Sequence, residues 1–166
     1  GLALGLGGST FPAMVANASH NPELMEQFNY DQIGCWAITE PDHGSDELDV
    51  NAAASATGHD RGRANCIARP DGNSIVINGQ KSAWVSNGTI AETAALFCTY
   101  DDGGEEVKHG VFLVDLKDKG VTRGKPTDKI GQRSLNQGEI FFDDVRIPTA
   151  NMVAPPERYT DFTTMI

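Results

Sequence analysis

Residues 35–46 read CWAITEPDHGSD, and the pattern of the chain changes at this stretch. The residues before it have the spacing of helices. After Gly34 come short runs rich in Val, Ile, Phe and Thr, separated by Gly, Asp and Asn, which is typical of an all-β sandwich or barrel. The segment CWAIT is the first predicted strand, and it leads into a turn that holds glycine, serine and three acidic residues. The predicted fold class is mainly β, with a β-barrel or sandwich-like middle domain preceded by a short helical segment.

Two helices are expected in the preceding segment. One runs from Thr10 to His20, with Pro12 near its start, where a missing N–H costs no hydrogen bond. The other runs from Asn21 to Phe28, with Asn21 as its N-cap. The early glycines lack the spacing of a phosphate-binding loop, so we interpret them as the approach to the first helix.

Short strands separated by turns are predicted for most of the remaining chain. Asn78-Gly79 predicts a type I′ hairpin, because both turn residues must take positive φ. A further turn is expected at Pro70–Asn73, and a helix is expected to begin at Glu157. The predicted strands cover residues 51–57, 64–68, 74–78, 82–86, 93–100, 109–116 and 139–147.

The composition of the chain limits the classes of partner that it can bind. The 166 residues carry a formal net charge of −10, which repels nucleic acid and acidic membrane surfaces. No apolar run approaches the roughly 18 residues needed to span a bilayer, and the N-terminus lacks the layout of a signal peptide. We therefore expect a soluble, intracellular, cytoplasmic protein that binds neither nucleic acid nor membranes.

Cysteine and histidine spacing indicates no metal site. The three cysteines form no CxxC pair, so reduced and buried thiols are expected. His20, His59 and His109 share no ligand spacing and are expected at the surface. Glu40 stands beside a proline in a turn, and we interpret it as a salt-bridge partner or an acceptor of N–H groups.

Two segments carry chemistry that allows more than one interpretation. The strand that ends at Thr39 leaves backbone groups available to a planar heterocycle, with hydroxyls from Thr39 and Ser45 nearby, or it simply leads into an ordinary β-turn. Trp84 and Ser86 are two apart in a strand and leave the same face. They form either an aromatic wall beside a hydroxyl, or a core tryptophan and a surface serine.

Three segments taken in order resemble the acyl-CoA dehydrogenase family of FAD flavoenzymes. They are ITEPDHGSD (38–46), INGQKSAWVSN (77–87) and IGQRSLNQGEIFFDDVRIP (130–148). The resemblance implies that residues 1–31 end an N-terminal helical domain and that residues 32–153 form the middle β-domain that binds flavin and acyl-CoA. It also implies that residues 154–166 begin a linker or helix toward a C-terminal helical domain that is absent from this chain.

The resemblance also implies roles for individual residues. Backbone groups of Trp36 and Ile38 and the Thr39 hydroxyl would line the flavin of FAD. Trp84 would pack against the ring, and Ser86 would form a hydrogen bond near the reactive flavin nitrogen. Ser45 would contact the CoA part of the substrate.

The reaction that the resemblance implies is α,β-dehydrogenation of an acyl-CoA thioester. The family places the catalytic base in the C-terminal domain, so no catalytic residue is assigned here and the fragment alone is expected to be inactive. For the parent protein, an electron-transfer acceptor protein and a homo-oligomer are expected. The alternatives are a relative acting as a flavin oxidase or monooxygenase, and a non-catalytic β-domain with a degenerate flavin site.

One departure from the family pattern bears on these roles. Ser82 and Ala83 both stand between Lys81 and Trp84, where many members have one residue. In a regular strand, an extra residue turns every later side chain to the opposite face, and a β-bulge can restore the facing. The roles of Trp84 and Ser86 therefore depend on a bulge.

Overall fold

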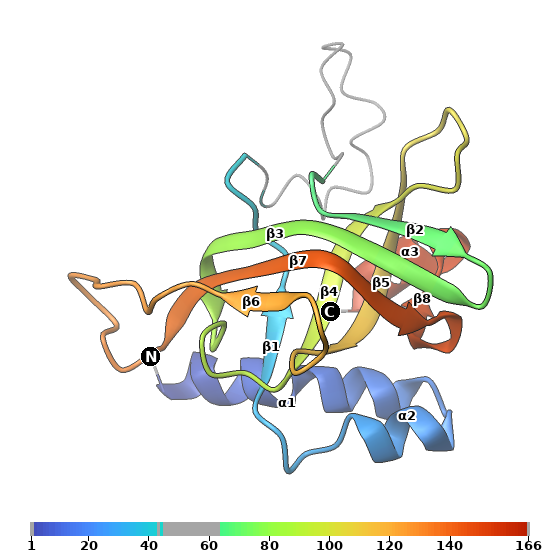
Figure 1. Cartoon of the computed structure of the whole chain (residues 1–166). Helices are drawn as coiled ribbons and strands as arrows, with labels where there is room; N and C mark the ends of the chain where they lie inside the picture. Colours follow the sequence, from blue (N-terminus) through green and yellow to red (C-terminus); the bar gives the residue numbers. More distant parts are fainter. Residues whose placement is uncertain (1, 43, 45–63, 166) are drawn as a thin grey trace.

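Strands dominate the structure, a computed structural model that describes residues 2–42, 44 and 64–165 (Figure 1). Within these residues, the hydrogen-bonded order is β6-β7-β3-β2-β4-β5-β8, and β1 pairs in parallel with β4. This arrangement confirms the mainly β class. The strands are β1 (Gly34–Ala37), β2 (Ile67–Asp71), β3 (Ser74–Ser86), β4 (Thr93–Tyr100), β5 (Lys108–Asp115), β6 (Val121–Arg123), β7 (Gln137–Pro148) and β8 (Met152–Ala154).

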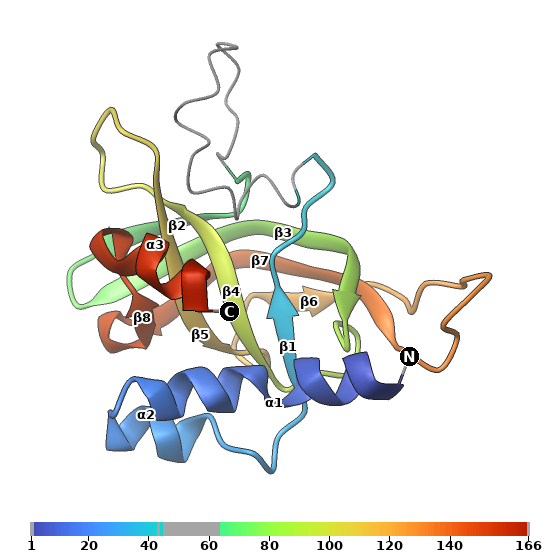
Figure 2. The same ribbon diagram turned by 180° about the vertical axis from the view of Figure 1, so that it is seen from behind.

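The sheet folds into two parts that face each other. Strands β6, β7, β3 and β2 form one part, in which every pairing is antiparallel, and β1, β4, β5 and β8 form the other. Only two residue pairs, Ile67 with Thr99 and Ala68 with Tyr100, join β2 to β4. Figures 1 and 2 show β3 and β7 on one side and β4 and β5 on the other. Apolar side chains from both parts fill the space between them, including Ile75, Ile77, Leu96, Phe112, Ile140 and Val145.

Strands β4 and β5 are buried on both faces. Alternate residues such as Leu96 and Phe112 enter the core between the two sheet parts. Their neighbours Phe97 and Leu113 point the other way, into a second core shared with the helices. This explains why TAALFCTY reads as a continuous apolar run rather than an alternating one.

The described part of the chain has three α-helices: α1 (Leu2–Ala18), α2 (Pro22–Gln27) and α3 (Pro156–Met165). Helix α1 packs on β1 and β4, α3 packs on β5 and β8, and α2 lies against α1 (Figure 2). A 3₁₀ turn, η3 (Thr149–Asn151), follows β7. The Asn21 side chain accepts a hydrogen bond from the Glu23 N–H at 3.0 Å, which confirms the predicted cap of α2. The predicted helix near Glu157 is α3.

The prediction that the first helix starts at Thr10 was wrong, because α1 begins at Leu2 and contains Pro12. Proline inside a helix removes one backbone hydrogen bond. Here the proline lies against the start of β1: a Cβ on Gly34 would come within 2.5 Å of both Pro12 Cδ and the Ser9 carbonyl oxygen. Close packing of α1 on β1 therefore accompanies the lost bond.

The predicted hairpin at Asn78-Gly79 was also wrong. Strand β3 continues through these residues with a register shift between Ile77 and Gly79, and the Asn78 side chain bonds Asp144 across to β7. Gly79 has φ of 129° and leaves no room for a Cβ, which would lie 2.6 Å from Cys66 Cα. The glycine thus lets β3 bend closely over the start of β2. The turn predicted at Pro70–Asn73 is confirmed: β2 and β3 are joined between Asp71 and Ser74, where Gly72 has φ of 61°.

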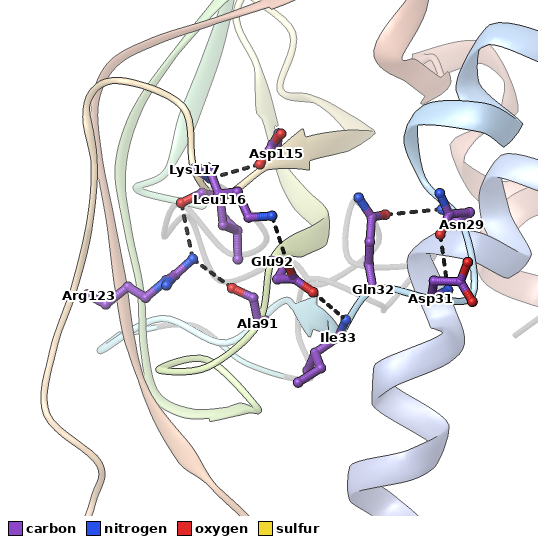
Figure 3. Close-up of polar contacts among 10 residues, drawn as sticks. All are labelled: Asn29, Asp31, Gln32, Ile33, Ala91, Glu92, Asp115, Leu116, Lys117 and Arg123. Carbon is purple, nitrogen blue, oxygen red and sulfur yellow. Dashed lines mark hydrogen bonds and ion pairs between the residues drawn. The ribbon is translucent and has the colours of Figure 1, made fainter.

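A polar network fastens the exit from the helices to the sheet (Figure 3). The Glu92 carboxylate accepts the Ile33 N–H at 3.2 Å and pairs with Lys117 at 2.7 Å. The Arg123 guanidinium donates to the carbonyls of Ala91 and Leu116. These contacts join the segment before β1, the start of β4, the end of β5 and β6.

The cysteines and two of the histidines lie among the described residues, so the predictions for them can be compared with the structure. All three cysteines are buried and outside disulfides, as predicted. His20 is exposed, whereas His109 is half-buried and stacks on Tyr159. Among the described residues, no helix is long and apolar enough to cross a membrane. Outside them lie His43, Ser45, Asp46, His59 and the predicted strand 51–57. The division at residues 31 and 153 stays a prediction.

Candidate ligand-binding pocket

A pocket of about 610 Å³ opens between α1, the end of β1, the end of β3 and α3. Its volume is within the range of small-molecule sites, roughly 300–1,000 Å³. The lining residues are Ala3, Leu4, Gly7, Gly8, Phe11, Met14, Trp36, Ile38, Thr39, Trp84, Ser86 and Met165. The five residues that the sequence predicts as cofactor contacts, Trp36, Ile38, Thr39, Trp84 and Ser86, therefore all lie in one pocket.

Trp36 forms the floor between the sheet and α1. Its ring stacks on Phe11 with centroids 4.5 Å apart and an interplanar angle of 18°, and it lies 6.0 Å from the Phe97 ring. The Trp36 indole Nε1 is buried without a hydrogen-bond partner among the described residues. A buried donor without a partner is uncommon in folded proteins.

The segment after β1 is fixed to β3 by reciprocal hydrogen bonds. The Ser82 N–H donates to the Thr39 carbonyl at 2.9 Å, and the Thr39 hydroxyl donates to the Ser82 carbonyl at 3.2 Å. The Lys81 ammonium donates to the Ile38 carbonyl at 2.7 Å. As a result, the Ile38 carbonyl already has a protein partner, and the Thr39 hydroxyl has only its oxygen left to offer a ligand.

Glu40 and Lys81 form a fully buried ion pair directly behind this segment. Their side chains are both 0% exposed, and Lys81 Nζ lies 2.6 Å from Glu40 Oε1. The same carboxylate accepts the N–H groups of Asn65 and Cys66. This confirms the interpretation of Glu40 as a salt-bridge partner and N–H acceptor. Three protein donors, from Lys81, Asn65 and Cys66, therefore occupy this carboxylate.

A bulge in β3 between Lys81 and Val85 adds two residues relative to β7 and includes Trp84. From Lys81 to Val85 the strand advances four residues, while its partner β7 advances two, from Ile140 to Gly138. Ala83 takes φ of 41° within the bulge. Trp84 at the end of the bulge is 60% exposed, Ser86 after the bulge is half-buried, and both line the pocket. The structural condition for the two predicted roles is therefore met.

Sequence reasoning missed the wall that α1 supplies. Because the first helix was expected to start at Thr10, Leu4, Gly7 and Gly8 were not assigned to the site. Gly7 has no atom within 4 Å of where its Cβ would stand, so the helix surface is open there. The only sequence signal was the run of small residues in the first turns, which fits several structures.

The described pocket-lining residues include no ionisable side chain. The pocket thus offers hydroxyls and aromatic faces but no acid or base of its own. Nearby, burial raises the pKa of the Cys35 thiol to about 12, although Arg123 acts in the opposite direction. Among the described residues, no group of three or more His, Cys, Asp or Glu side chains could hold a metal ion.

Comparison with known sequences gives a family match over most of the chain. The family model described as "Acyl-CoA dehydrogenase, middle domain" matches residues 35–145. The short-chain specific acyl-CoA dehydrogenase of Rattus norvegicus mitochondria is 35% identical over 128 residues, which are 77% of this chain and 27% of the relative. The chain therefore spans about a quarter of the length of the curated relatives it matches.

Solved structures share the fold. Butyryl-CoA dehydrogenase from Megasphaera elsdenii aligns with a TM-score of 0.78 and 22% identity, covering 98% of this chain and 40% of that one. At this identity the likeness shows the fold alone. A glutaryl-CoA dehydrogenase from Mycobacterium smegmatis, solved in complex with FADH2, aligns with a TM-score of 0.67 and 26% identity, covering 89% of this chain and 35% of that one.

Proposed function

This chain belongs to the acyl-CoA dehydrogenase family, and from that membership we propose that its pocket binds the flavin ring of FAD. One observation carries the proposal. Residues from two separate stretches of the sequence line a single pocket: Trp36, Ile38 and Thr39 from residues 35–46, and Trp84 and Ser86 from residues 77–87.

The residues present fit a flavin. A flat tricyclic ring suits a pocket with two indoles, one already stacked on Phe11 and one, Trp84, largely exposed. The Ser86 hydroxyl can donate and the Thr39 oxygen can accept, which matches a heterocycle with both kinds of polar atom. FAD, when bound, supplies the two-electron acceptor of the reaction. The apolar wall would exclude water from the reacting face.

The proposed reaction is the α,β-dehydrogenation of an acyl-CoA thioester, with Ser45 contacting the CoA portion. The rat relative is a short-chain specific acyl-CoA dehydrogenase and the Mycobacterium smegmatis structure is a glutaryl-CoA dehydrogenase, which supports the reaction class. Since the part of the pocket lining that the structure describes holds no ionisable side chain, we expect no turnover from a polypeptide of these 166 residues alone. An electron-transfer acceptor protein as partner and a homo-oligomeric assembly are part of the same proposal.

A titration with FAD tests the flavin site. The chain is expressed with its native flanking sequence, and flavin absorbance and fluorescence are followed. Trp84→Ala is expected to weaken binding about tenfold, or about 1.4 kcal/mol, because a stacking face is lost. Tyr30→Ala is the matched control, since Tyr30 is a similarly exposed aromatic outside the pocket, 57% against 60%. Absence of saturable binding, or equal affinities for wild type and Trp84→Ala, contradicts the proposal.

The same pocket would serve a flavin oxidase or monooxygenase, or a β-domain that binds without catalysis. Electron-acceptor preference separates the first two from a dehydrogenase: fast reoxidation by O₂ favours an oxidase or monooxygenase. Flavin that binds but is never reduced by any acyl-CoA favours the non-catalytic alternative. The cytoplasmic location also stays a prediction, and the rat relative is named as mitochondrial.

A further inference from the structure

We propose that Gln137 is a positioning residue that sets the direction of the Ser86 hydroxyl, so that its hydrogen is donated into the pocket. The inference rests on the proposed flavin site and adds to it a residue outside the two stretches of sequence that line the pocket. Gln137 does not itself line the pocket.

The two residues face each other across the sheet. Ser86 on β3 is the register partner of Gln137 on β7, so their side chains leave the same face. Gln137 Nε2 lies 3.3 Å from Ser86 Oγ and 3.1 Å from the Trp84 carbonyl oxygen. A single amide group thus contacts both ends of the Trp84–Ser86 segment, where the bulge ends and regular pairing with β7 resumes.

The groups on either side of the Gln137 amide determine its orientation. Lys129 Nζ lies 2.8 Å from Gln137 Oε1 and 2.7 Å from the Leu135 carbonyl. An ammonium group can only donate, and the Trp84 carbonyl can only accept. The amide oxygen must therefore face Lys129, and its nitrogen must face Trp84 and Ser86. The flipped orientation would lose both contacts at once.

This orientation determines what Ser86 can offer. Since Gln137 Nε2 donates to Ser86 Oγ, the single hydroxyl hydrogen remains available for another acceptor, and the described residues provide none. Thr39 is the opposite case, because its hydrogen is taken by the Ser82 carbonyl and only its oxygen remains. The pocket thus presents a donor at Ser86 and an acceptor at Thr39. A planar heterocycle with an unprotonated ring nitrogen facing Ser86, as in oxidised flavin, satisfies the donor.

The test reverses the polarity of Gln137 with little change in shape. Gln137→Glu keeps the contact with Lys129 but can only accept, so the Ser86 hydrogen turns toward the carboxylate and away from the pocket. The probes are FAD and 5-deaza-FAD, in which carbon replaces the ring nitrogen that would accept from Ser86. Gln132→Glu, an exposed residue with the same change of charge, is the control.

With native flanking sequence present, wild type is expected to bind FAD about tenfold more tightly than 5-deaza-FAD, the effect of one hydrogen bond. Gln137→Glu is expected to remove this preference by weakening FAD alone, while Gln132→Glu keeps it. Ser86→Ala should abolish the preference too, and adding Gln137→Glu to it should change nothing further.

Three outcomes overturn the inference. Equal weakening of both flavins by Gln137→Glu would mean a general structural role, and an unchanged preference would mean that Gln137 does not direct Ser86. In either case the flavin site stands. Failure of wild type to bind either flavin is a different result, because it overturns the proposed function together with the inference.

Discussion

Lys81 and Glu40 form an ion pair in the interior, with both side chains 0% exposed, and each charge stabilises the other. Replacing one member of such a pair leaves an unpaired buried charge, which costs about 3–5 kcal/mol. We therefore expect Lys81→Met to lower the free energy of unfolding by about that amount, measured by urea denaturation. Lys108→Met is the control, because the Lys108–Asp102 pair is about one-third exposed and such pairs contribute about 1 kcal/mol or less.

A double variant shows whether the charge or the packing matters. Adding Glu40→Gln to Lys81→Met removes the stranded carboxylate while the side-chain volume changes little. Part of the lost stability should return, although the amide then has to satisfy the N–H groups of Asn65 and Cys66. If the double variant loses as much as the sum of the two single variants, the two charges do not act as a pair.

The contact between α1 and β1 depends on a glycine. At Gly34 a Cβ would meet Pro12 Cδ and the Ser9 carbonyl at 2.5 Å, so Gly34→Ala must push the helix from the strand. We expect a loss of about 1–3 kcal/mol in urea denaturation, as for other overpacked sites. Gly7→Ala is the matched control, since its Cβ would meet nothing within 4 Å and alanine favours a helix. A Gly34→Ala protein as stable as wild type would contradict this packing.

In the polar network of Figure 3, the titratable carboxylate of Glu92 links the segment before β1 to Lys117, which follows β5. The Lys117 side chain, followed by the Ile33 N–H, lowers the pKa of Glu92. A carboxyl group with a lowered folded pKa adds stability above its unfolded value, and that stability is lost as the pH falls through the folded value. Glu92→Gln should therefore lower the melting temperature at pH 7, and its difference from wild type should shrink in acid. A difference that stays constant between pH 7 and pH 3 would contradict this assignment.

Apolar runs predicted most strands well, because the burial of a strand is visible directly in its consecutive apolar residues. The predicted strand 93–100 coincides with β4. The errors came where long-range packing overrides local signals. Pro12 looked like a helix start but lies inside α1, and Asn78-Gly79 looked like a hairpin but serves a bend in β3. The residues that decide these two cases are distant in sequence: Gly34 packs against Pro12, and Cys66 packs against Gly79.

The candidate site shows the same division. The five residues that the sequence predicts as cofactor contacts come from two short stretches, and all five line the pocket, while their roles stay predictions. The α1 wall was missed, since it depends on where a distant helix packs. The bulge that turns Trp84 and Ser86 toward the pocket was stated only as a condition. Gln137 was missed because its contact with Ser86 follows from the register of β3 and β7, and a single sequence does not reveal that register.

The pocket joins the layers of the molecule, because α1, β1, β3 and α3 all contribute to its lining. A ligand there contacts both the helical layer and the two sheet parts, so binding should stabilise them together. For a ligand that binds only the folded state, a concentration of about 100 times Kd adds about 2.7 kcal/mol to the free energy of unfolding.

We therefore expect saturating FAD to raise the urea midpoint and to slow amide hydrogen exchange in α1 as well as in β1 and β3. Mass spectrometry of proteolytic peptides would measure the exchange. The acidic turn at 101–106 is the internal control, since none of its residues lines the pocket. Trp84→Ala should reduce all of these effects together at a fixed FAD concentration. Protection confined to β1 and β3, with α1 unchanged, would mean that the helix does not form a wall of the flavin site.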